Sequence, residues 1–208
     1  MEVVKEFSSK KNKVKLVRIN GKNIVLKSFI EPEGFFRELS VYNKITICNG
    51  FIPKVFSYNI ESKELFLEYL DGVTLLEYLE ICEIKNHYET AYLILVKFFK
   101  WLYTFHKLKI FEESKHVLYD VNFRNFIICE DQVFGIDFED VQVGLQINDY
   151  IKAIAMYLLY DPIESSFKKR VVNQLLLYLD EQESYKIDVL NNMINKEIGN
   201  IKNRRSNK

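Results

Sequence analysis

The feature that most constrains this chain is a change of hydrophobic pattern along its length. Between residues 14 and 29 apolar and polar residues alternate in two short runs, which is typical of strands, and the Asn20-Gly21 pair between them is a hairpin turn signal. Pro32 then begins a pattern of helical period that runs to about Ile47. The chain therefore begins as a β-hairpin followed by a helix.

The helix after this hairpin carries a charged residue on its apolar face. Phe35, Leu39 and Tyr42 share one face at helical spacing, and Glu38 lies among them. A carboxylate on an apolar face is costly unless a cation pairs with it. Lys27, near the end of the preceding strand, is the candidate partner. The alternative is that Glu38 lies at the edge of the stripe and reaches water.

Two more strands and a helix are predicted next. The β-rich runs 54–58 and 63–69 are followed by a break at Asp71-Gly72. Thr74 can then cap a helix with an apolar face. Residues 1 to about 70 therefore form a small sheet that carries one helix.

The second half of the chain is mainly helical, with β character between residues 117 and 138. A strongly apolar helix is predicted from Tyr88 to His106, and helical patterns return after Asp149 and from Phe167 to Leu179. We therefore predict an α+β fold, with a small N-terminal sheet part and a mainly helical C-terminal part.

A hairpin within the β segment brings oxygen-bearing side chains together. Apolar runs flank a turn, and folding them about Asp131 places Asn125 opposite Asp137. An amide oxygen beside a carboxylate suits Mg²⁺, with phosphate oxygens completing the shell. Asp120, in the preceding loop, suits a base that orients an acceptor hydroxyl and takes its proton during phosphoryl transfer.

These residues, in this order, resemble the protein-kinase-like superfamily, whose members pair a strand lysine with a helix glutamate ahead of an Asp-x-x-x-x-Asn loop and a metal-binding aspartate. The matching residues are Lys27, Glu38, Asp120, Asn125 and Asp137. The resemblance covers about residues 14–165. It implies ATP and Mg²⁺ as cofactors, with Lys27 on the α- and β-phosphates, Asn125 and Asp137 on the metal, and Asp120 as the catalytic base.

The resemblance also implies a two-lobed organisation. Residues 1–67 would form the N-terminal lobe, 68–72 the hinge and 73–198 the helical C-terminal lobe, ahead of a flexible basic tail over 199–208. The hinge backbone at Glu68 and Leu70 would bind adenine. Asp149 resembles the structural aspartate that braces the catalytic loop from the next helix.

The motif style resembles the small-molecule kinases of the superfamily. The Ile-Asp-Phe-Glu stretch around Asp137 is similar to that of aminoglycoside phosphotransferases, choline kinases and lipopolysaccharide-core kinases. Only about a dozen residues separate Asp137 from Asp149, too few for a peptide-docking platform. The resemblance therefore implies transfer of the ATP γ-phosphate to a hydroxyl acceptor, with a small molecule expected and a protein as the alternative.

Two departures from the family pattern favour a rival hypothesis. Leu118 stands where typical members have a histidine, and no Gly-rich loop joins the first strands, where Ser8–Asn12 is the nearest candidate for a phosphate cover. A pseudokinase, a nucleotide-binding scaffold or regulatory module, would tolerate both. It would have no need for Asp120, however. A third hypothesis, an interaction domain without a ligand, leaves Glu38 and the hairpin residues unexplained.

No sequence motif identifies the acceptor, because acceptor pockets differ from one family to the next. Arg124 would contact phosphate or substrate, or else form a salt bridge that braces the loop. His106 and His116 are expected to be structural or ordinary loop residues. The candidate residues for binding a cationic acceptor, which could equally be solvated surface carboxylates, are Glu77, Glu80, Glu83, Glu139 and Asp140.

Composition narrows the class of protein. The formal net charge is zero, which gives no general case for nucleic-acid binding. The three cysteines, Cys48, Cys82 and Cys129, are far apart and suggest neither a disulfide framework nor a zinc site. No signal-peptide core begins the sequence and no run approaches a membrane span, so we expect a cytoplasmic protein.

Overall fold

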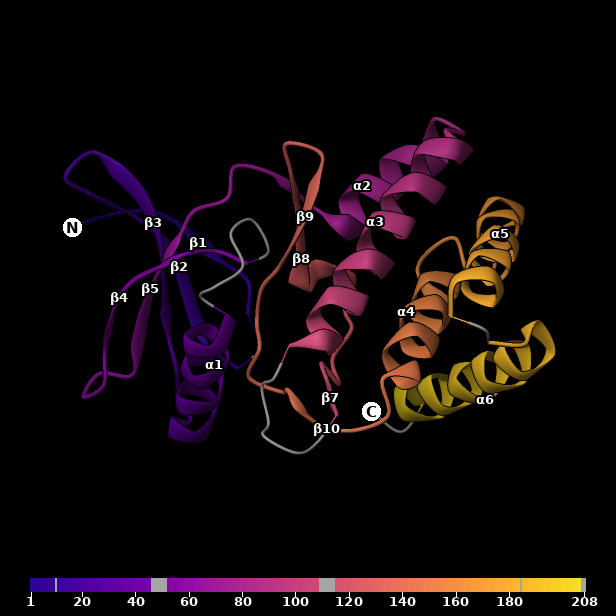
Figure 1. Cartoon of the computed structure of the whole chain (residues 1–208). Helices are drawn as coiled ribbons and strands as arrows, with labels where there is room; N and C mark the ends of the chain where they lie inside the picture. Colours follow the sequence, from indigo (N-terminus) through magenta and orange to yellow (C-terminus); the bar gives the residue numbers. More distant parts are fainter. Residues whose placement is uncertain (10, 46–51, 109–114, 184, 207–208) are drawn as a thin grey trace.

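The chain is an α+β structure whose sheet and helices occupy different parts of the sequence. The computed structural model describes residues 1–9, 11–45, 52–108, 115–183 and 185–206. An antiparallel sheet with one helix forms the N-terminal part, and helices form most of the remainder (Figure 1). The predicted α+β class is confirmed at this level. Cys48 and the predicted helix end at Ile47 lie outside the described residues.

The N-terminal sheet has five antiparallel strands. In spatial order these are β1 (Glu2–Phe7), β2 (Lys13–Ile19), β3 (Lys22–Ser28), β5 (Glu64–Glu68) and β4 (Val55–Asn59). The predicted hairpin is confirmed: β2 pairs with β3, and Asn20 and Gly21 both adopt positive φ, as a two-residue primed turn requires. Strand β1 was not predicted, because its residues are almost all exposed and show no buried alternation.

Helix α1 (Pro32–Ile45) is the one helix among these strands in the described part of the chain, as predicted. It buries Phe35, Leu39 and Tyr42 together with Glu38 on one face. Figure 1 shows α1 beside the sheet. The apolar period therefore determines which way Glu38 points, because the three apolar neighbours must leave water together.

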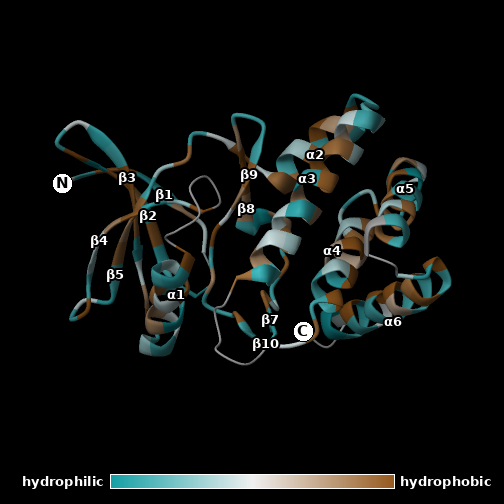
Figure 2. Cartoon of the chain, in the orientation of Figure 1, coloured by the Kyte–Doolittle hydropathy of each residue, from teal (hydrophilic) through white to brown (hydrophobic). Residues whose placement is uncertain are grey.

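Helices dominate the rest of the chain. They are α2 (Leu75–Ile84), α3 (Tyr88–Lys107), α4 (Ile147–Leu159), α5 (Ser166–Glu183) and α6 (Ile187–Ser206). The predicted cap is confirmed, since Thr74 Oγ1 accepts from the Glu77 amide at 3.2 Å and the Glu77 carboxylate accepts from the Thr74 amide at 2.8 Å. In Figure 2 polar and apolar residues share each of these helices, as expected where one face packs and another meets water.

Short strands connect the helices. They are β6 (Val73–Thr74), β7 (His116–Val117), β8 (Phe126–Cys129), β9 (Gln132–Gly135) and β10 (Gln142–Val143), with a 3-10 turn at Phe123–Asn125. Strands β6, β8 and β9 form one small sheet, and β7 pairs with β10. The predicted β segment between 117 and 138 is therefore present, and its hairpin is β8–β9.

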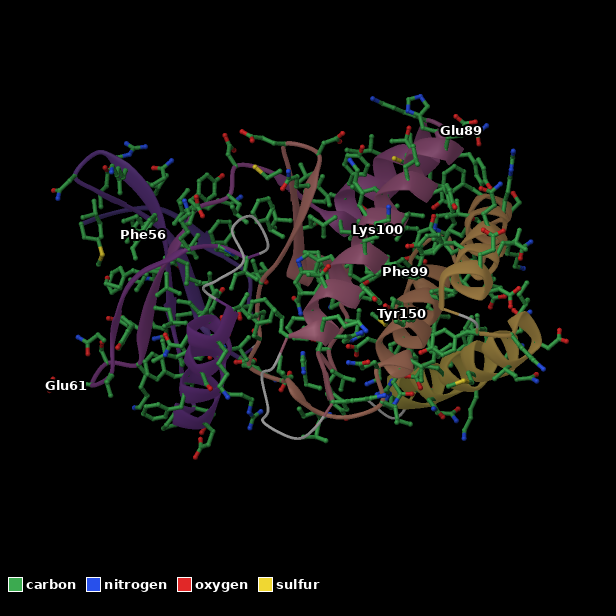
Figure 3. All side chains as sticks on the ribbon, viewed as in Figure 1. Phe56, Glu61, Glu89, Phe99, Lys100 and Tyr150 are labelled. Carbon is green, nitrogen blue, oxygen red and sulfur yellow. The ribbon has the colours of Figure 1, made fainter. Side chains whose placement is uncertain are left out.

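Aromatic side chains fill the core around α3. Phe98, Phe99, Trp101 and Phe105 are all buried on this helix. Figure 3 labels Phe99 on α3 and Tyr150 on α4, whose rings meet edge to face with centroids 5.3 Å apart. The expectation that the α3 aromatics are core residues is confirmed.

The prediction of a flexible basic tail over residues 199–208 is wrong up to Ser206. Helix α6 continues through this segment, and Ile201 is buried against Ala155 and Leu159 of α4. The apolar contact outweighs the polar composition that suggested a tail. Asn207 and Lys208 lie outside the described residues.

A helix that crosses a bilayer must be both long and continuously apolar. Within the described ranges, none is both long and apolar enough to cross a membrane.

Gly135 allows the β8–β9 hairpin to approach α3. A Cβ at this position would lie 2.2 Å from Cζ2 of the buried Trp101. We expect Gly135→Ala to lower the free energy of unfolding by about 1–3 kcal/mol, because the indole must move within a packed core. Urea denaturation measures this change.

Gly199→Ala is the matched control. A Cβ at Gly199, within α6, would meet nothing within 4 Å. Because alanine is the better helix former, this variant should gain roughly 0.5–1 kcal/mol. Equal stability of the Gly135 variant and the native chain would show that Trp101 yields freely and that the close approach is not required.

Candidate functional site

Three charged residues predicted for the site meet between the sheet and the β8–β9 hairpin. Lys27 lies on β3, Glu38 on α1 and Asp137 directly after β9. Lys27 Nζ is 2.6 Å from Glu38 Oε2 and 2.7 Å from Asp137 Oδ1. The predicted ion pair between Lys27 and Glu38 is therefore confirmed, and the alternative in which Glu38 reaches water is wrong.

The three charges differ in their access to solvent. The side chains of Lys27 and Glu38 keep 7% and 1% of their surface exposed, whereas Asp137 keeps 36%. One carboxylate oxygen, Glu38 Oε1, is buried and has no hydrogen-bond partner among the described residues. Within this group the Glu38 carboxylate is therefore closed off from solvent, whereas the Asp137 carboxylate is open to it.

The pKa values of Lys27 and Glu38 reflect this burial. Burial raises the pKa of the Glu38 carboxyl to about 7, because the nearby Asp137 and Glu139 carboxylates add to desolvation and outweigh part of the attraction to Lys27. Burial alone would lower the pKa of the Lys27 ammonium, but Glu38 and Asp137 raise it above its ordinary value. Lys27 is thus a permanent cation.

Phe138 positions Asp137. Its ring meets Tyr42 of α1 edge to face at 5.5 Å and stacks on Phe105 of α3 at 6.0 Å. Asp137 itself has φ +67°, a left-handed conformation that is costly for a residue with a Cβ. Packing of Phe138 holds the backbone there, which aims the preceding carboxylate at Lys27.

The predicted register of the β8–β9 hairpin is wrong by one residue. Phe126 pairs with Gly135, and the Ile136 amide donates to the Asn125 carbonyl at 2.9 Å, so Asn125 lies opposite Ile136 and not opposite Asp137. The turn has two residues, Glu130 and Asp131, both with positive φ, instead of being centred on Asp131. No hydrogen bond between described residues joins Asn125 to Asp137.

Asp120 and Asn125 lie together at the end of the loop that precedes β8. Asn125 Nδ2 is 3.5 Å from Asp120 Oδ2, a long contact. Asp120 reaches solvent, yet desolvation by its surroundings raises the pKa of its carboxyl, and the charges of Asp137 and Asp140 raise it further. A carboxylate with a raised pKa is a better proton acceptor.

Asp149 braces the same loop from the first turn of α4. This fully buried carboxylate accepts from the Leu118 amide and from His106 Nε2 through Oδ2, both at 2.9 Å. The brace implied by the family resemblance is present, and it reaches the loop through the backbone of Leu118. His106 and His116 are both buried structural residues, since His116 Nε2 lies 2.8 Å from the Phe105 carbonyl.

Glu139 joins three elements, a role that the sequence reasoning missed. Its Oε2 accepts from Asn12 at 2.7 Å, its Oε1 lies 3.2 Å from Lys11 Nζ, and its carbonyl accepts from Arg37 of α1 at 2.7 Å. Lys11 also binds Asp140 at 2.8 Å. The predicted cover segment Ser8–Asn12, whose Lys10 lies outside the described residues, is therefore tied to the stretch that follows Asp137.

The predicted hinge lies at the end of β5. The Glu68 amide donates to the Lys54 carbonyl at 2.8 Å, and the Leu70 carbonyl accepts from Gly72 at 3.0 Å. Outside the strand ladders, the hydrogen bonds of the described residues use neither the Glu68 carbonyl nor the Leu70 amide. The role of these two backbone groups in adenine binding therefore stays a prediction.

Arg124 forms no salt bridge with the described carboxylates and instead lies over the Tyr160 ring at 5.9 Å, so the loop-bracing salt bridge is wrong. Cys82 is buried and Cys129 half-buried, and both are free thiols.

Comparison with known proteins adds no assignment: no protein-family model matches the chain, and neither does any curated protein. One carboxylate oxygen from each of Glu38, Asp137 and Glu139 lies within 4.8 Å of the others, beside the Lys27 ammonium. Such a mixed group can bind a phosphate through the amine and a hard cation through the open carboxylate.

Replacing Lys27 should destabilise the fold, because the buried Glu38 carboxylate then lacks its cation. We expect Lys27→Met to lose about 3–5 kcal/mol of unfolding free energy, because one partner of a buried pair is left unpaired. The double variant Lys27→Met/Glu38→Leu should recover most of this loss. Urea denaturation of the three proteins gives the comparison.

The loss in Lys27→Met should also depend on pH. Without the ammonium, the pKa of Glu38 rises beyond its value of about 7, while the unfolded chain keeps the ordinary 4.5. Between pH 4.5 and this raised pKa the native state binds more protons than the unfolded chain, so stability falls as pH rises from about 4.5 through about 7 and beyond. The double variant should show no such fall. A flat profile in the single variant would mean that another cation pairs with Glu38.

Proposed function

We propose that this chain is a phosphotransferase with a protein-kinase-like fold, which moves the γ-phosphate of Mg·ATP to a hydroxyl acceptor. The observation that carries the proposal is the buried Lys27, which bridges a helix glutamate and an aspartate 110 residues further along the chain. This is the grouping that the family resemblance implies. An interaction domain would have no reason to bury these charges together.

The arrangement of the elements supports the same proposal. Among the described residues, a five-stranded antiparallel sheet with one helix precedes a helical part (Figure 1). The ion pair of Lys27 on β3 with Asp137 after β9 joins the two parts. In the proposal residues 1–67 form the N-terminal lobe, 68–72 the hinge and 73–198 the C-terminal lobe. The Glu68 carbonyl and the Leu70 amide are the groups that would bind adenine.

Lys27 and Glu38 would act as a phosphate clamp. Lys27 keeps its charge and is held by Glu38 at 2.6 Å, so its ammonium is already positioned for the α- and β-phosphates of a nucleotide. Lys11 and Asn12 are the residues of the Ser8–Asn12 segment that would cover these phosphates. Their side chains would take the part that backbone amides play in a Gly-rich loop.

The metal ligands in the proposal are Asp137 and Asn125. Asp137 keeps an exposed carboxylate, and Asn125 offers an amide oxygen from the adjacent strand end, so the donor set fits a hard cation. Bound there, Mg²⁺ would neutralise phosphate charge. Glu38 and Glu139 are less suited as ligands, because Lys27 and Asn12 already bind their oxygens.

Asp120 is the proposed base. Its carboxylate would orient the acceptor hydroxyl and take its proton as the acceptor oxygen bonds to the γ-phosphorus and ADP departs. The raised pKa of Asp120 favours this role. Asp149 would act only by positioning, through its hydrogen bond to Leu118.

One observation favours the rival pseudokinase. Asp137 and Lys27 are already bonded to each other at 2.7 Å, so each could serve structure alone. A scaffold of this kind would bind nucleotide without transferring phosphate. The two experiments below separate the possibilities.

Mg·ATP should stabilise the native chain against heat. At about 100 times the dissociation constant, binding adds roughly 2.7 kcal/mol. For a domain of this size the melting temperature should rise by about 5–10 °C. Asp137→Asn should lose the metal-dependent part of the rise, whereas the exposed control Asp180→Asn should keep it. If the melting temperature of the native chain did not change at saturating nucleotide, the proposed ATP site would be contradicted.

Asp120→Asn should separate binding from transfer. The amide cannot accept the acceptor proton, so turnover with the first acceptor identified should fall by about 10²-fold or more. The Mg·ATP melting shift should remain, because Asp120 does not hold the nucleotide. Unchanged turnover in this variant would remove Asp120 from the mechanism. A native chain that binds Mg·ATP but phosphorylates no acceptor would favour the pseudokinase.

A further inference from the structure

The structure argues against a cationic acceptor. Four of the five carboxylates considered for that purpose already have partners: Glu77 caps α2, Glu83 pairs with Lys168 at 3.0 Å, and Glu139 and Asp140 both bind Lys11. These charges are therefore not free to receive an amine. The remaining candidate, Glu80, is an isolated exposed residue on α2.

Cations, in contrast, surround the loop of Asp120 without carboxylate partners. They are Arg124 in the loop itself, Lys152 on α4 and Arg205 near the end of α6. None of the three forms a salt bridge with a carboxylate of the described residues. The C-terminal end of α6 packs beside α4, as Figure 1 shows, which brings Arg205 to the end of α4 that contacts this loop.

Lys152 is the most unusual of the three. It is half-buried, its Nζ donates to the Tyr119 carbonyl at 3.0 Å, and it lies 3.9 Å from the centre of the Tyr119 ring. Burial lowers the pKa of Lys152, and the charges of Asp149, Glu197 and Asp120 act against this effect. A partly desolvated ammonium with no carboxylate partner is a ready acceptor of an anion.

Tyr160 joins the two arginines to the same loop. Its hydroxyl donates to Asn122 Oδ1 at 3.1 Å and accepts from the Phe123 amide at 3.2 Å, which fixes the loop against the end of α4. Arg124 lies over the Tyr160 ring, and Arg205 reaches the carbonyl of the preceding Leu159 at 3.4 Å. The charges of Arg124, Arg205 and Asp120 all act on the Tyr160 hydroxyl.

We infer that Arg124, Lys152 and Arg205 form an oxyanion site beside Asp120, and that the acceptor is a small hydroxyl compound bearing a phosphate or carboxylate group. Guanidinium groups bind both oxyanions through paired hydrogen bonds, and the lysine adds a point charge. The assignment of this anion to the acceptor rests on the proposed function. The anion site itself does not.

Orthophosphate, without nucleotide or Mg²⁺, tests the site directly. Thermal unfolding of the whole chain is followed as phosphate replaces chloride at constant ionic strength, and an acetate series gives the response to a carboxylate. We expect saturable stabilisation by at least one of the two ions. The double variant Arg124→Gln/Lys152→Gln should weaken that binding by about tenfold, because two charged contacts are lost.

The matched control removes two lysines from another face. Lys97→Gln/Lys100→Gln on α3, where Figure 3 labels Lys100, should leave the response unchanged. Equal binding in the Arg124/Lys152 variant and the native chain, or no response to either ion, would overturn the anion site even if Mg·ATP still binds.

A second measurement tests the link to the acceptor. Under kinase conditions, kcat/KM is compared for hydroxyl compounds of similar size that are anionic, neutral or cationic, such as glucose 6-phosphate, glucose and glucosamine. We expect the anionic compound to be favoured by about tenfold, and Lys152→Gln to remove that preference mainly through KM. A higher kcat/KM for the cationic compound would overturn the assignment.

Discussion

The buried ammonium of Lys27 is the interaction on which the rest of the arrangement depends. A charge removed from water must be matched by anions, and here they come from α1 and from the segment after β9. One partner is 11 residues away in the sequence and the other 110. Because Lys27 binds carboxylates from both parts, it links the N-terminal sheet to the helical part of the chain. The half-exposed carboxylate of Asp137 lies at their junction.

Aromatic packing provides the frame that makes this charge arrangement possible. Phe138 contacts Tyr42 on one side and the stacked rings of Trp101 and Phe105 on the other. The close approach requires a glycine at position 135, where a Cβ would meet the Trp101 ring. It also holds Asp137 in a left-handed conformation, a local cost that neighbouring packing must offset. Stability of the core and orientation of the carboxylate are thus linked.

Most elements were predictable because their signals are local, and the errors occurred where they are not. Asn20-Gly21 and Thr74 act within a few residues, and the hairpin and the cap are both present. The β8–β9 register was misplaced because Glu130 adopts positive φ without being a glycine. Strand β1 has no buried face to produce a pattern, and the polar end of α6 concealed a helix held by Ile201.

The sequence by itself determined the α+β class and the order of most elements, and it made Lys27 the candidate partner of Glu38, because hydrophobic period and a charge on an apolar face are properties of short segments. Only the tertiary structure decided that Glu38 binds Lys27 and does not reach water, that Asp137 completes this pair, and that Glu139 ties Lys11 and Asn12 to the site. These residues meet through packing of elements far apart in the chain, and no local preference specifies which surfaces will be brought together.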